Sequence, residues 1–377
     1  MVNSNVLEIG KLKIGGENPI FVIAEIGLNH NQSLKMAKDL IDVAVDSGCS
    51  AAKFQTFRAE DVYIEGTRAG TYKLMDKEIP IYSLHKSLEM PESWIEVLRD
   101  YCREKGILFF TSPIGYQAVD LIEKYNVEAI KISSYECTNI PYLEYVSSKG
   151  IPIILSTGAC RLSEVEEAVG IIKQHHEKLA LMHCVTKYPA NFASANLNVL
   201  KTLRYAFNLP TGFSDNGFID EFNNIDFLQV PIEAAKQGAD LFEIHITLDR
   251  SLPGPDHGFA TEPHELLQTV DAMNRIRKEY LSGNRFDHSP LISGTTKKLT
   301  LPEEIYVRNF AFKCLYSTKS IKRGESLNTL NIGILRPGEM KRGLDPKYFK
   351  MITENNCKAS RDIDAWQPIL WADLLNL

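Results

Sequence analysis

Short apolar runs alternate with amphipathic segments along most of the chain. Each run has the length of a buried strand, and each segment repeats its apolar positions with the period of a helix. The first pair is a run at 20–24 followed by a helical pattern at 33–47. Ser33 is a suitable cap for that helix, and Gly48 follows it as a stop signal. The order predicted here is a strand followed by a helix.

Eight such pairs follow one another. The predicted strands are 20–24, 51–57, 107–111, 129–133, 151–156, 179–185, 211–215 and 241–247. The helical patterns that follow them are 33–47, 91–105, 116–125, 139–149, a segment starting at 163, 196–207, 226–237 and 262–280. Strands separated by helices are typically parallel. We therefore expect an α/β fold, a (β/α)8 TIM barrel, for which roughly 250 residues is typical. An open doubly wound sheet is the alternative.

The pattern changes near residue 283. Residues 282–290 are typical of a linker, and short strand-like pieces at 310–316, 322–325 and 335–338 then alternate with Gly and Pro turns. The predicted organisation is a barrel domain at 1–285, a linker at 286–306 and a small β-rich domain at 307–377. Because about 70 residues give only a marginal core, we expect this domain to pack on a barrel, its own or a partner's.

Composition narrows the function classes. The 377 residues are 44% hydrophobic and 24% charged, with a net charge of −6, so neither a disordered chain nor a nucleic-acid partner is expected. The seven cysteines are scattered without a C-x-x-C pair, which fits a reducing cytosol. No apolar run approaches the roughly 18–20 residues of a membrane span, and no signal peptide is visible. We expect a cytoplasmic protein without a membrane partner.

Polar residues close the predicted strands, where the active site of such a barrel lies. Lysines with small hydroxyls favour an anion such as phosphate, and carboxylates with histidines can hold a divalent metal or move protons. A structural role is open for any one of them, such as a Glu25–Lys53 pair or a core histidine, so the prediction depends on their convergence. The set comprises Glu25, Lys53, Gln55, Thr111, Ser112, Lys131, Ser133, Ser134, Ser156, Thr157, His183, Ser214, Asp215, Glu243 and His245, with Asp256 nearby.

The segment 58–90 is longer than most barrel loops. A lid over the site and a solvated insertion are both open interpretations.

Several motifs resemble the sialic acid synthases. They are Ala24-Glu-Ile-Gly-Leu-Asn-His30, Lys53-Phe-Gln55, Thr111-Ser-Pro113, Lys131-Ile-Ser-Ser134, Ser156-Thr-Gly158, His183-Cys-Val-Thr-Lys-Tyr-Pro-Ala190 and Leu248-Asp-Arg-Ser-Leu-Pro-Gly-Pro-Asp-His257. The segments at 321–325 and 335–338 look like that family's antifreeze-like (SAF) domain. Within the family, residues 87–91, 101–105 and 182–185 are most similar to the spore-coat polysaccharide synthase branch.

The resemblance implies a (β/α)8 barrel with a SAF domain in a domain-swapped homodimer. It also implies condensation of phosphoenolpyruvate with an open-chain sugar aldehyde, N-acetylmannosamine-like or a related hexose. The products would be a nonulosonic, sialic-type acid and phosphate. A divalent metal, Mn²⁺ or Mg²⁺, would polarise the aldehyde.

The resemblance also assigns roles to residues. The catalytic group would comprise Glu25, Lys53, Lys131, His245 and Asp256. Phosphoenolpyruvate would be bound by Lys53, Thr111, Lys131, Ser134, Ser156 and Ser214. The acceptor would meet Gln55, Tyr188, Asp256 and Lys313. The metal would be held by His245, with the amide oxygen of Asn216 as a weaker second ligand.

The chain departs from the family pattern at the metal and acceptor positions. Asn216 stands where the family usually has a histidine ligand, Glu243-Ile-His245 lacks the usual lysine, and Lys313 replaces an arginine. Two alternatives stay open, the first because Lys131 closes a strand and the second because the histidine ligand is lost. One is a Schiff-base aldolase that uses Lys131. The other is a non-catalytic relative that binds phosphoenolpyruvate or a sugar ligand.

Overall fold

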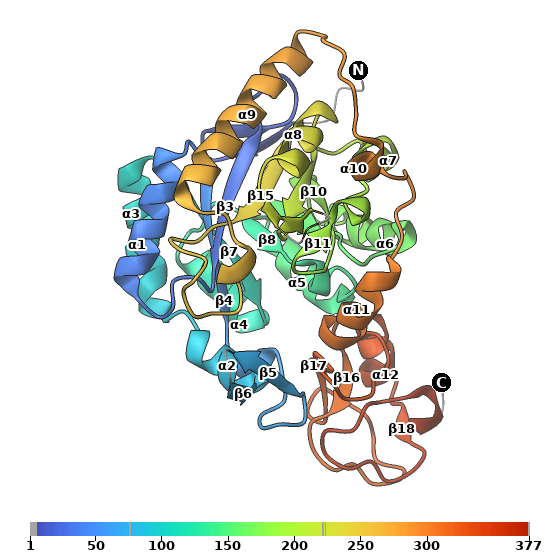
Figure 1. Cartoon of the computed structure of the whole chain (residues 1–377). Helices are drawn as coiled ribbons and strands as arrows, with labels where there is room; N and C mark the ends of the chain where they lie inside the picture. The colour runs from blue at the N-terminus through green and yellow to red at the C-terminus, as the bar shows by residue number, and fades with distance from the viewer. Residues whose placement is uncertain (1–5, 75–76, 221, 223, 376–377) are drawn as a thin grey trace.

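The computed structural model describes residues 6–74, 77–220, 222 and 224–375. Eight parallel strands close into a barrel in the order β10-β12-β15-β3-β4-β7-β8-β9 (Figure 1). The first and last of these strands in the chain pair from Leu241 with Phe21 to His245 with Glu25, which closes the sheet. Their bounds are β3 (Phe21–Gly27), β4 (Ala51–Phe57), β7 (Leu108–Ile114), β8 (Ile130–Ile132), β9 (Ile153–Ser156), β10 (Leu179–Cys184), β12 (Thr211–Asp215) and β15 (Leu241–His245). The predicted barrel is confirmed, and an open sheet is excluded.

Helices surround the barrel and cover the strands (Figure 1). They are α1 (Leu34–Asp46), α3 (Glu92–Lys105), α4 (Tyr116–Lys124), α5 (Ile140–Ser148), α6 (Leu162–Lys173), α7 (Val199–Phe207), α8 (Gln229–Lys236) and α9 (Pro263–Leu281). Ser33 caps α1 by accepting a hydrogen bond from the Met36 amide at 3.2 Å, as its sequence position predicts. Gly106 ends α3 in a left-handed conformation, with φ of 78°.

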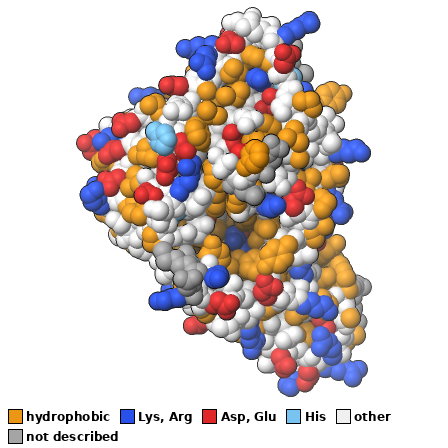
Figure 2. Space-filling view, in the orientation of Figure 1, with side chains coloured by type: hydrophobic (Ala, Val, Ile, Leu, Met, Phe, Trp, Pro, Cys, Tyr) orange, Lys and Arg blue, Asp and Glu red, His pale blue; other side chains and the backbone are white. Residues whose placement is uncertain are grey.

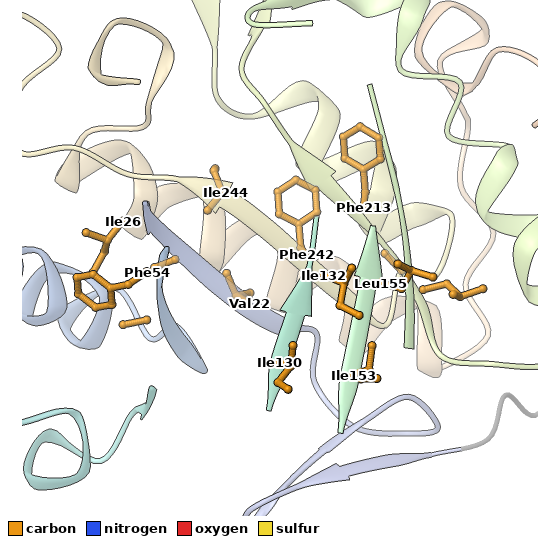
Figure 3. Close-up of a cluster of buried hydrophobic side chains, with 14 of the residues drawn as sticks. Val22, Ile26, Phe54, Ile130, Ile132, Ile153, Leu155, Phe213, Phe242 and Ile244 are labelled. Carbon is orange, nitrogen blue, oxygen red and sulfur yellow. The ribbon is translucent and has the colours of Figure 1, made fainter. Parts of the chain in front are cut away.

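Two apolar layers hold the barrel together. One fills the space between the strands and the helices, and Figure 3 shows part of it, including Phe54, Phe213 and Phe242. The other fills the barrel interior near the amino ends of the strands, where Phe21 stacks on Phe110 at 5.9 Å between ring centroids. The hairpin of β1 (Leu7–Ile9) and β2 (Leu12–Ile14) contributes to this inner cluster. One end of the barrel is thereby closed by apolar side chains.

The segment 58–90 contains regular structure. It forms a hairpin of β5 (Thr71–Leu74) and β6 (Lys77–Pro80), then α2 (Ile81–Leu88). Val62, Tyr63 and Leu84 pack in one apolar cluster with Phe57 at the end of β4. This segment is thus a packed insertion at the carboxyl end of the barrel.

The C-terminal region has its own small core and lies against the barrel (Figure 1). Its elements are α10 (Pro290–Ser293), α11 (Ile305–Ala311), β16 (Cys314–Ser317), β17 (Ile332–Leu335), α12 (Phe349–Glu354), β18 (Lys358–Ala359) and β19 (Leu374–Leu375). The strand expected at 310–316 begins only at Cys314, because Phe310 and Ala311 end a helix. The strand-like pieces at 322–325 and 335–338 are also mostly turns, although Leu335 ends β17.

The domain limits 1–285, 286–306 and 307–377 stay predictions, and their ends at 1–5 and 376–377 lie outside the described residues. The seven cysteines form no disulfide. Among the described residues, no helix has both the length and the apolar character that crossing a bilayer requires.

Candidate active site

The inner face of the barrel changes from apolar to polar along the strands. Side chains two residues apart in a strand lie on the same face. Ile23 belongs to the interior cluster, so Glu25 also points into the barrel. Ala51 and Lys53 have the same relation on the neighbouring strand. The polar half of the interior forms a cavity at the carboxyl ends of the strands. Strand residues that line it in this way are Glu25, Lys53, Ser112, Lys131, Ser156, Cys184, Ser214, Glu243 and His245.

Lysines and carboxylates alternate on the cavity floor. The Lys53 Nζ lies 2.5 Å from Glu25 Oε2 and 3.8 Å from Glu243 Oε1. The Lys131 Nζ lies 3.5 Å from the same Glu243 oxygen, and Ser214 donates a hydrogen bond to it at 3.1 Å. All five side chains are buried. Each lysine of the floor therefore has a carboxylate partner.

Burial shifts the pKa values of these groups unequally. Burial raises the pKa of Glu25, and this effect outweighs the attraction of Lys53. Burial also opposes ionisation of Glu243, but Lys131 and Lys53 overcome it and lower the pKa of that carboxyl. Burial lowers the pKa of the Lys131 ammonium and of the His245 imidazole. The floor thus pairs one carboxyl group of raised pKa with one of lowered pKa.

Hydroxyl groups complete the floor. Ser134 accepts a hydrogen bond from the Gly158 amide at 2.8 Å, and Lys53 donates one to Ser112 at 3.1 Å. The Ser133 and Ser156 hydroxyls are buried without a hydrogen-bond partner among the described residues. Hydroxyls left in this state beside two lysines are suited to an anionic ligand.

One nitrogen atom and one oxygen atom at the cavity floor are free to act as ligands of a divalent cation. The His245 Nδ1 and the Glu243 Oε2 are both buried and have no hydrogen-bond partner in the described part of the chain. A lowered pKa keeps the imidazole neutral, as a metal ligand must be. Asn216 also lines the cavity, with its amide nitrogen donating to the Val185 carbonyl at 2.8 Å, which leaves its oxygen as the available donor. The donor set fits a hard metal ion.

A second acidic group lies outside the cavity. Ligand atoms of Glu262, His264 and Glu265 come within 4.8 Å of one another. Arg250 contacts both carboxylates, so one of their two negative charges is already neutralised by this side chain.

Most residues that the sequence singled out line this cavity, and others do not. Glu25, Lys53, Gln55, Lys131, Ser134, Ser156, Tyr188, Ser214, Asn216 and His245 do. Thr111 faces away from it and exchanges a hydrogen bond with Thr56 at 2.7 Å. Asp256 is half-buried beside the cavity and acts electrostatically on His245 and Lys53. Lys313 lies elsewhere, 3.4 Å from Glu136 and 2.9 Å from the Asp61 carbonyl.

His183 has a structural environment. Its Nε2 lies 3.0 Å from the Ala195 carbonyl, and its ring packs edge-on against Phe213. This strand-end histidine is a core residue, one of the two roles that its sequence position left open.

The upper part of the cavity is aromatic and includes residues that the motifs did not indicate. Tyr135 and Tyr188 share a hydrogen bond at 2.9 Å, and His85 and Arg336 also line this part. Figure 2 shows a hollow on this face, with Lys or Arg atoms inside and hydrophobic side chains along its rim. Strand alternation could have selected Ser112 in place of Thr111, whereas no local signal points to Arg336.

Comparison with known proteins decides the family. The sequence profile of the NeuB family matches residues 40–285, more than half of the chain. The chain belongs to the NeuB family. This confirms the resemblance that the motifs carried.

Relatives of this NeuB-family chain match it from end to end. The spore coat polysaccharide biosynthesis protein SpsE of Bacillus subtilis is 38% identical over 98% of this chain and 97% of its own length. The N,N'-diacetyllegionaminic acid synthase of Legionella pneumophila is 30% identical over 95% of each chain. The crystal structure of SpsE superposes with a TM-score of 0.87 and covers 99% of this chain and 100% of that one. The C-terminal region thus belongs to the shared architecture.

Proposed function

We propose that this protein condenses phosphoenolpyruvate with the open-chain aldehyde of an N-acetylmannosamine-like or related hexose. The products would be a nonulosonic acid and phosphate. The observation that carries the proposal is the buried ring of lysines, hydroxyls and carboxyl groups on the barrel floor. Membership of the NeuB family supports a C–C bond-forming enzyme, as does similarity to a relative named for legionaminic acid synthesis.

The lysines and serines would bind phosphoenolpyruvate. Lys53 and Lys131 supply positive charge, and the free hydroxyls of Ser133 and Ser156 supply hydrogen bonds to phosphate or carboxylate oxygens. The Ser134 hydroxyl, whose oxygen accepts a hydrogen bond from the Gly158 amide, would donate a further hydrogen bond to phosphoenolpyruvate. Thr111 would act only through the strand that it shares with Ser112.

The carboxyl groups of the site would position the aldehyde and transfer protons. Carbon 3 of phosphoenolpyruvate would attack the aldehyde carbon, water would add at carbon 2, and the tetrahedral intermediate would expel phosphate by C–O cleavage. Glu25, with a raised pKa, would hold or move the proton of the added water, while the Gln55 amide donates to its Oε1 at 2.9 Å. Asp256 would keep its electrostatic influence on His245.

The donors His245, Glu243 and Asn216 would hold Mn²⁺ or Mg²⁺. Such an ion, when bound, polarises a carbonyl oxygen as a Lewis acid. Because one donor is an amide in place of imidazole, we expect a preference for a hard, oxygen-seeking metal.

Phosphate release from phosphoenolpyruvate tests the proposal. It is measured against a panel of amino-sugar aldehydes, with and without chelator and with each metal restored. We expect release only when an acceptor and a metal are both present. Binding of phosphoenolpyruvate without release under any combination would instead identify a non-catalytic relative.

The lowered pKa of Lys131 favours a second candidate, a Schiff-base aldolase. Borohydride reduction in the presence of a carbonyl substrate would then trap an adduct, detected by mass, that K131M cannot form. We expect no adduct, because Lys131 is paired with Glu243.

We also propose the domain division 1–285, 286–306 and 307–377, with a SAF-type second domain and a homodimer. The C-terminal region of the structure packs on its own barrel, so a domain-swapped homodimer would exchange these same contacts, such as that of Arg336 with Val62, between the two barrels. Sedimentation of the whole protein tests the dimer, and a monomer at all concentrations would exclude it.

A further inference from the structure

Arg336 reaches the cavity from the C-terminal region. It follows β17, and its backbone amide donates to the Val62 carbonyl at 2.9 Å, which fixes this position over the barrel. Its side chain is only 7% exposed and lines the same cavity as Lys131 and Ser134. A residue about 90 positions beyond the last barrel strand therefore faces the floor of the site.

Aromatic rings hold the guanidinium. Its central carbon lies 4.8 Å from the ring centre of Tyr135 and 5.8 Å from that of Tyr63. Tyr135 is itself fixed by its hydrogen bond to Tyr188. A planar cation stacked between rings is oriented before any ligand arrives.

This cation has no counter-charge in the described part of the chain. No described carboxylate oxygen lies within 4.0 Å of Arg336, and its Nε is buried without a hydrogen-bond partner. Glu136 acts on it only at longer range and is already bonded to Lys313 and, at 2.7 Å, to Asn139. The floor lysines differ, since each has a carboxylate partner. The two tyrosine rings beside the guanidinium are uncharged, and a buried cation without a carboxylate partner is costly, so an anionic ligand offsets part of that cost.

We propose that Arg336 binds an anionic oxygen group, carboxylate or phosphate, of a substrate in this cavity. Two of its nitrogens can meet two oxygens of one such group, a geometry that lysine cannot reproduce. The inference rests on the proposed function and extends it, since it makes the segment after β17 part of the binding site. The group can belong to phosphoenolpyruvate or to an acceptor sugar that carries a phosphate.

The structure distinguishes Arg336 from Lys313, the C-terminal residue that the family resemblance assigned to the acceptor. Lys313 is turned to Glu136 and the Asp61 carbonyl, outside the cavity lining. Among the described residues of the C-terminal region, Arg336 is thus the one whose charge lines the cavity.

Calorimetric binding with R336Q and R336K tests the proposal. The ligands are phosphoenolpyruvate, N-acetylmannosamine and N-acetylmannosamine 6-phosphate. R323Q is the control, because Arg323 is an exposed arginine of the same region. We expect R336Q to weaken binding of an anionic ligand by about 10- to 100-fold, R336K to restore part of it, and R323Q to match wild type.

The two sources separate in this experiment. Weaker binding of phosphoenolpyruvate places its carboxylate or phosphate on Arg336, whereas weaker binding of the sugar phosphate alone assigns an anionic acceptor. Unchanged binding of both ligands overturns the proposal, as does wild-type protein that binds neither. Thermal unfolding shows whether each variant is folded. If R336Q does not fold, the affinity of R336K is compared with that of the wild type instead. Because binding needs no turnover, failure of the proposed condensation would be seen separately, as absence of phosphate release.

Discussion

His30 is a buried imidazole just beyond β3, enclosed by aromatic rings. Its ring centre lies 5.6 Å from that of Trp94 and 6.3 Å from that of Phe54. Its Nδ1 accepts a hydrogen bond from the Gln32 amide at 3.1 Å. Burial lowers the pKa of His30 to about 4, so the folded protein keeps it neutral where the unfolded chain would protonate it.

This group makes stability pH-dependent. Its contribution is fully present above pH 6.5 and is lost as the pH falls toward 4, which amounts to about 2 kcal/mol between pH 7.5 and pH 5. H30Q lacks this titrating group. Its free energy of unfolding should therefore fall by about 2 kcal/mol less than that of the wild type between pH 7.5 and pH 5. Urea denaturation at both pH values measures it, and equal losses in the two proteins would contradict it.

Glu25 should matter for chemistry more than for binding. Its raised pKa and its position beside Lys53 suit proton transfer, so E25Q should lower the rate of phosphate release by about 100-fold or more. Calorimetry should show phosphoenolpyruvate still bound. The surface variant E177Q is the control, since Glu177 pairs with Lys173 at the protein surface, away from the cavity. A loss of binding equal to the loss of rate would assign Glu25 a binding role instead.

The sequence located most cavity residues because they close apolar runs. The end of an apolar run does not by itself tell which of two neighbouring residues points inward, so Thr111 and Ser112 were both candidates. Alternation from the inward-facing Phe110 selects Ser112. The sequence could not predict Arg336 as a cavity residue, because the position of Arg336 depends on contacts with Val62 and Tyr63, which are distant in the chain.

At the level of elements, Gly212 lies at a close approach of β12 and β15. A Cβ at this position would lie 1.8 Å from the Leu241 carbonyl oxygen. Backbone cannot give way as a flexible side chain can, so G212A should lower the free energy of unfolding by about 3 kcal/mol or more. Chemical denaturation measures this effect.

Gly170 on α6 provides the matched control. It is exposed, and a Cβ there meets nothing within 4 Å. G170A should therefore raise the free energy of unfolding by about 1 kcal/mol through helix propensity. Similar effects of the two substitutions would show that packing between the strands is not the cause.

The eight barrel strands were predictable to within three residues at each end, because buried parallel strands are continuous apolar runs. Residues 310–316 were not, since a short apolar run fits both a strand and a helix. There Phe310 and Ala311 continue the helix that starts at Ile305, and the chain extends only afterwards.

At the scale of the whole molecule, Glu304 ties the C-terminal region to the barrel. Its Oε1 accepts hydrogen bonds from the amides of Ala159 and Thr186, each at 2.9 Å, in the loops after β9 and β10. The side chain is 1% exposed. E304A leaves two buried amides without a partner and should cost about 3 kcal/mol in the free energy of unfolding.

The conservative variant E304Q keeps an oxygen acceptor and should cost clearly less than E304A. Denaturation of both variants checks this order. Equal losses would point to the charge of Glu304 and away from its hydrogen bonds.

The sequence divided the chain into a barrel and a small appended region, but it could not say how they meet. The contacts join residues that are distant in the chain, such as Glu339 with Ala69, where the amide and carbonyl are 3.1 Å apart. Such pairings leave no local periodicity to detect.

The pairing of β3 with β15 sets an order of events during synthesis. The edge of β3 finds its partner only when residues 241–245 have left the ribosome, after some 220 further residues have been translated. Until then β3, whose seven residues are all buried in the finished protein, has one edge without a partner strand. The emerging chain is therefore most exposed to aggregation in this interval, and it is the arrival of β15 that ends it.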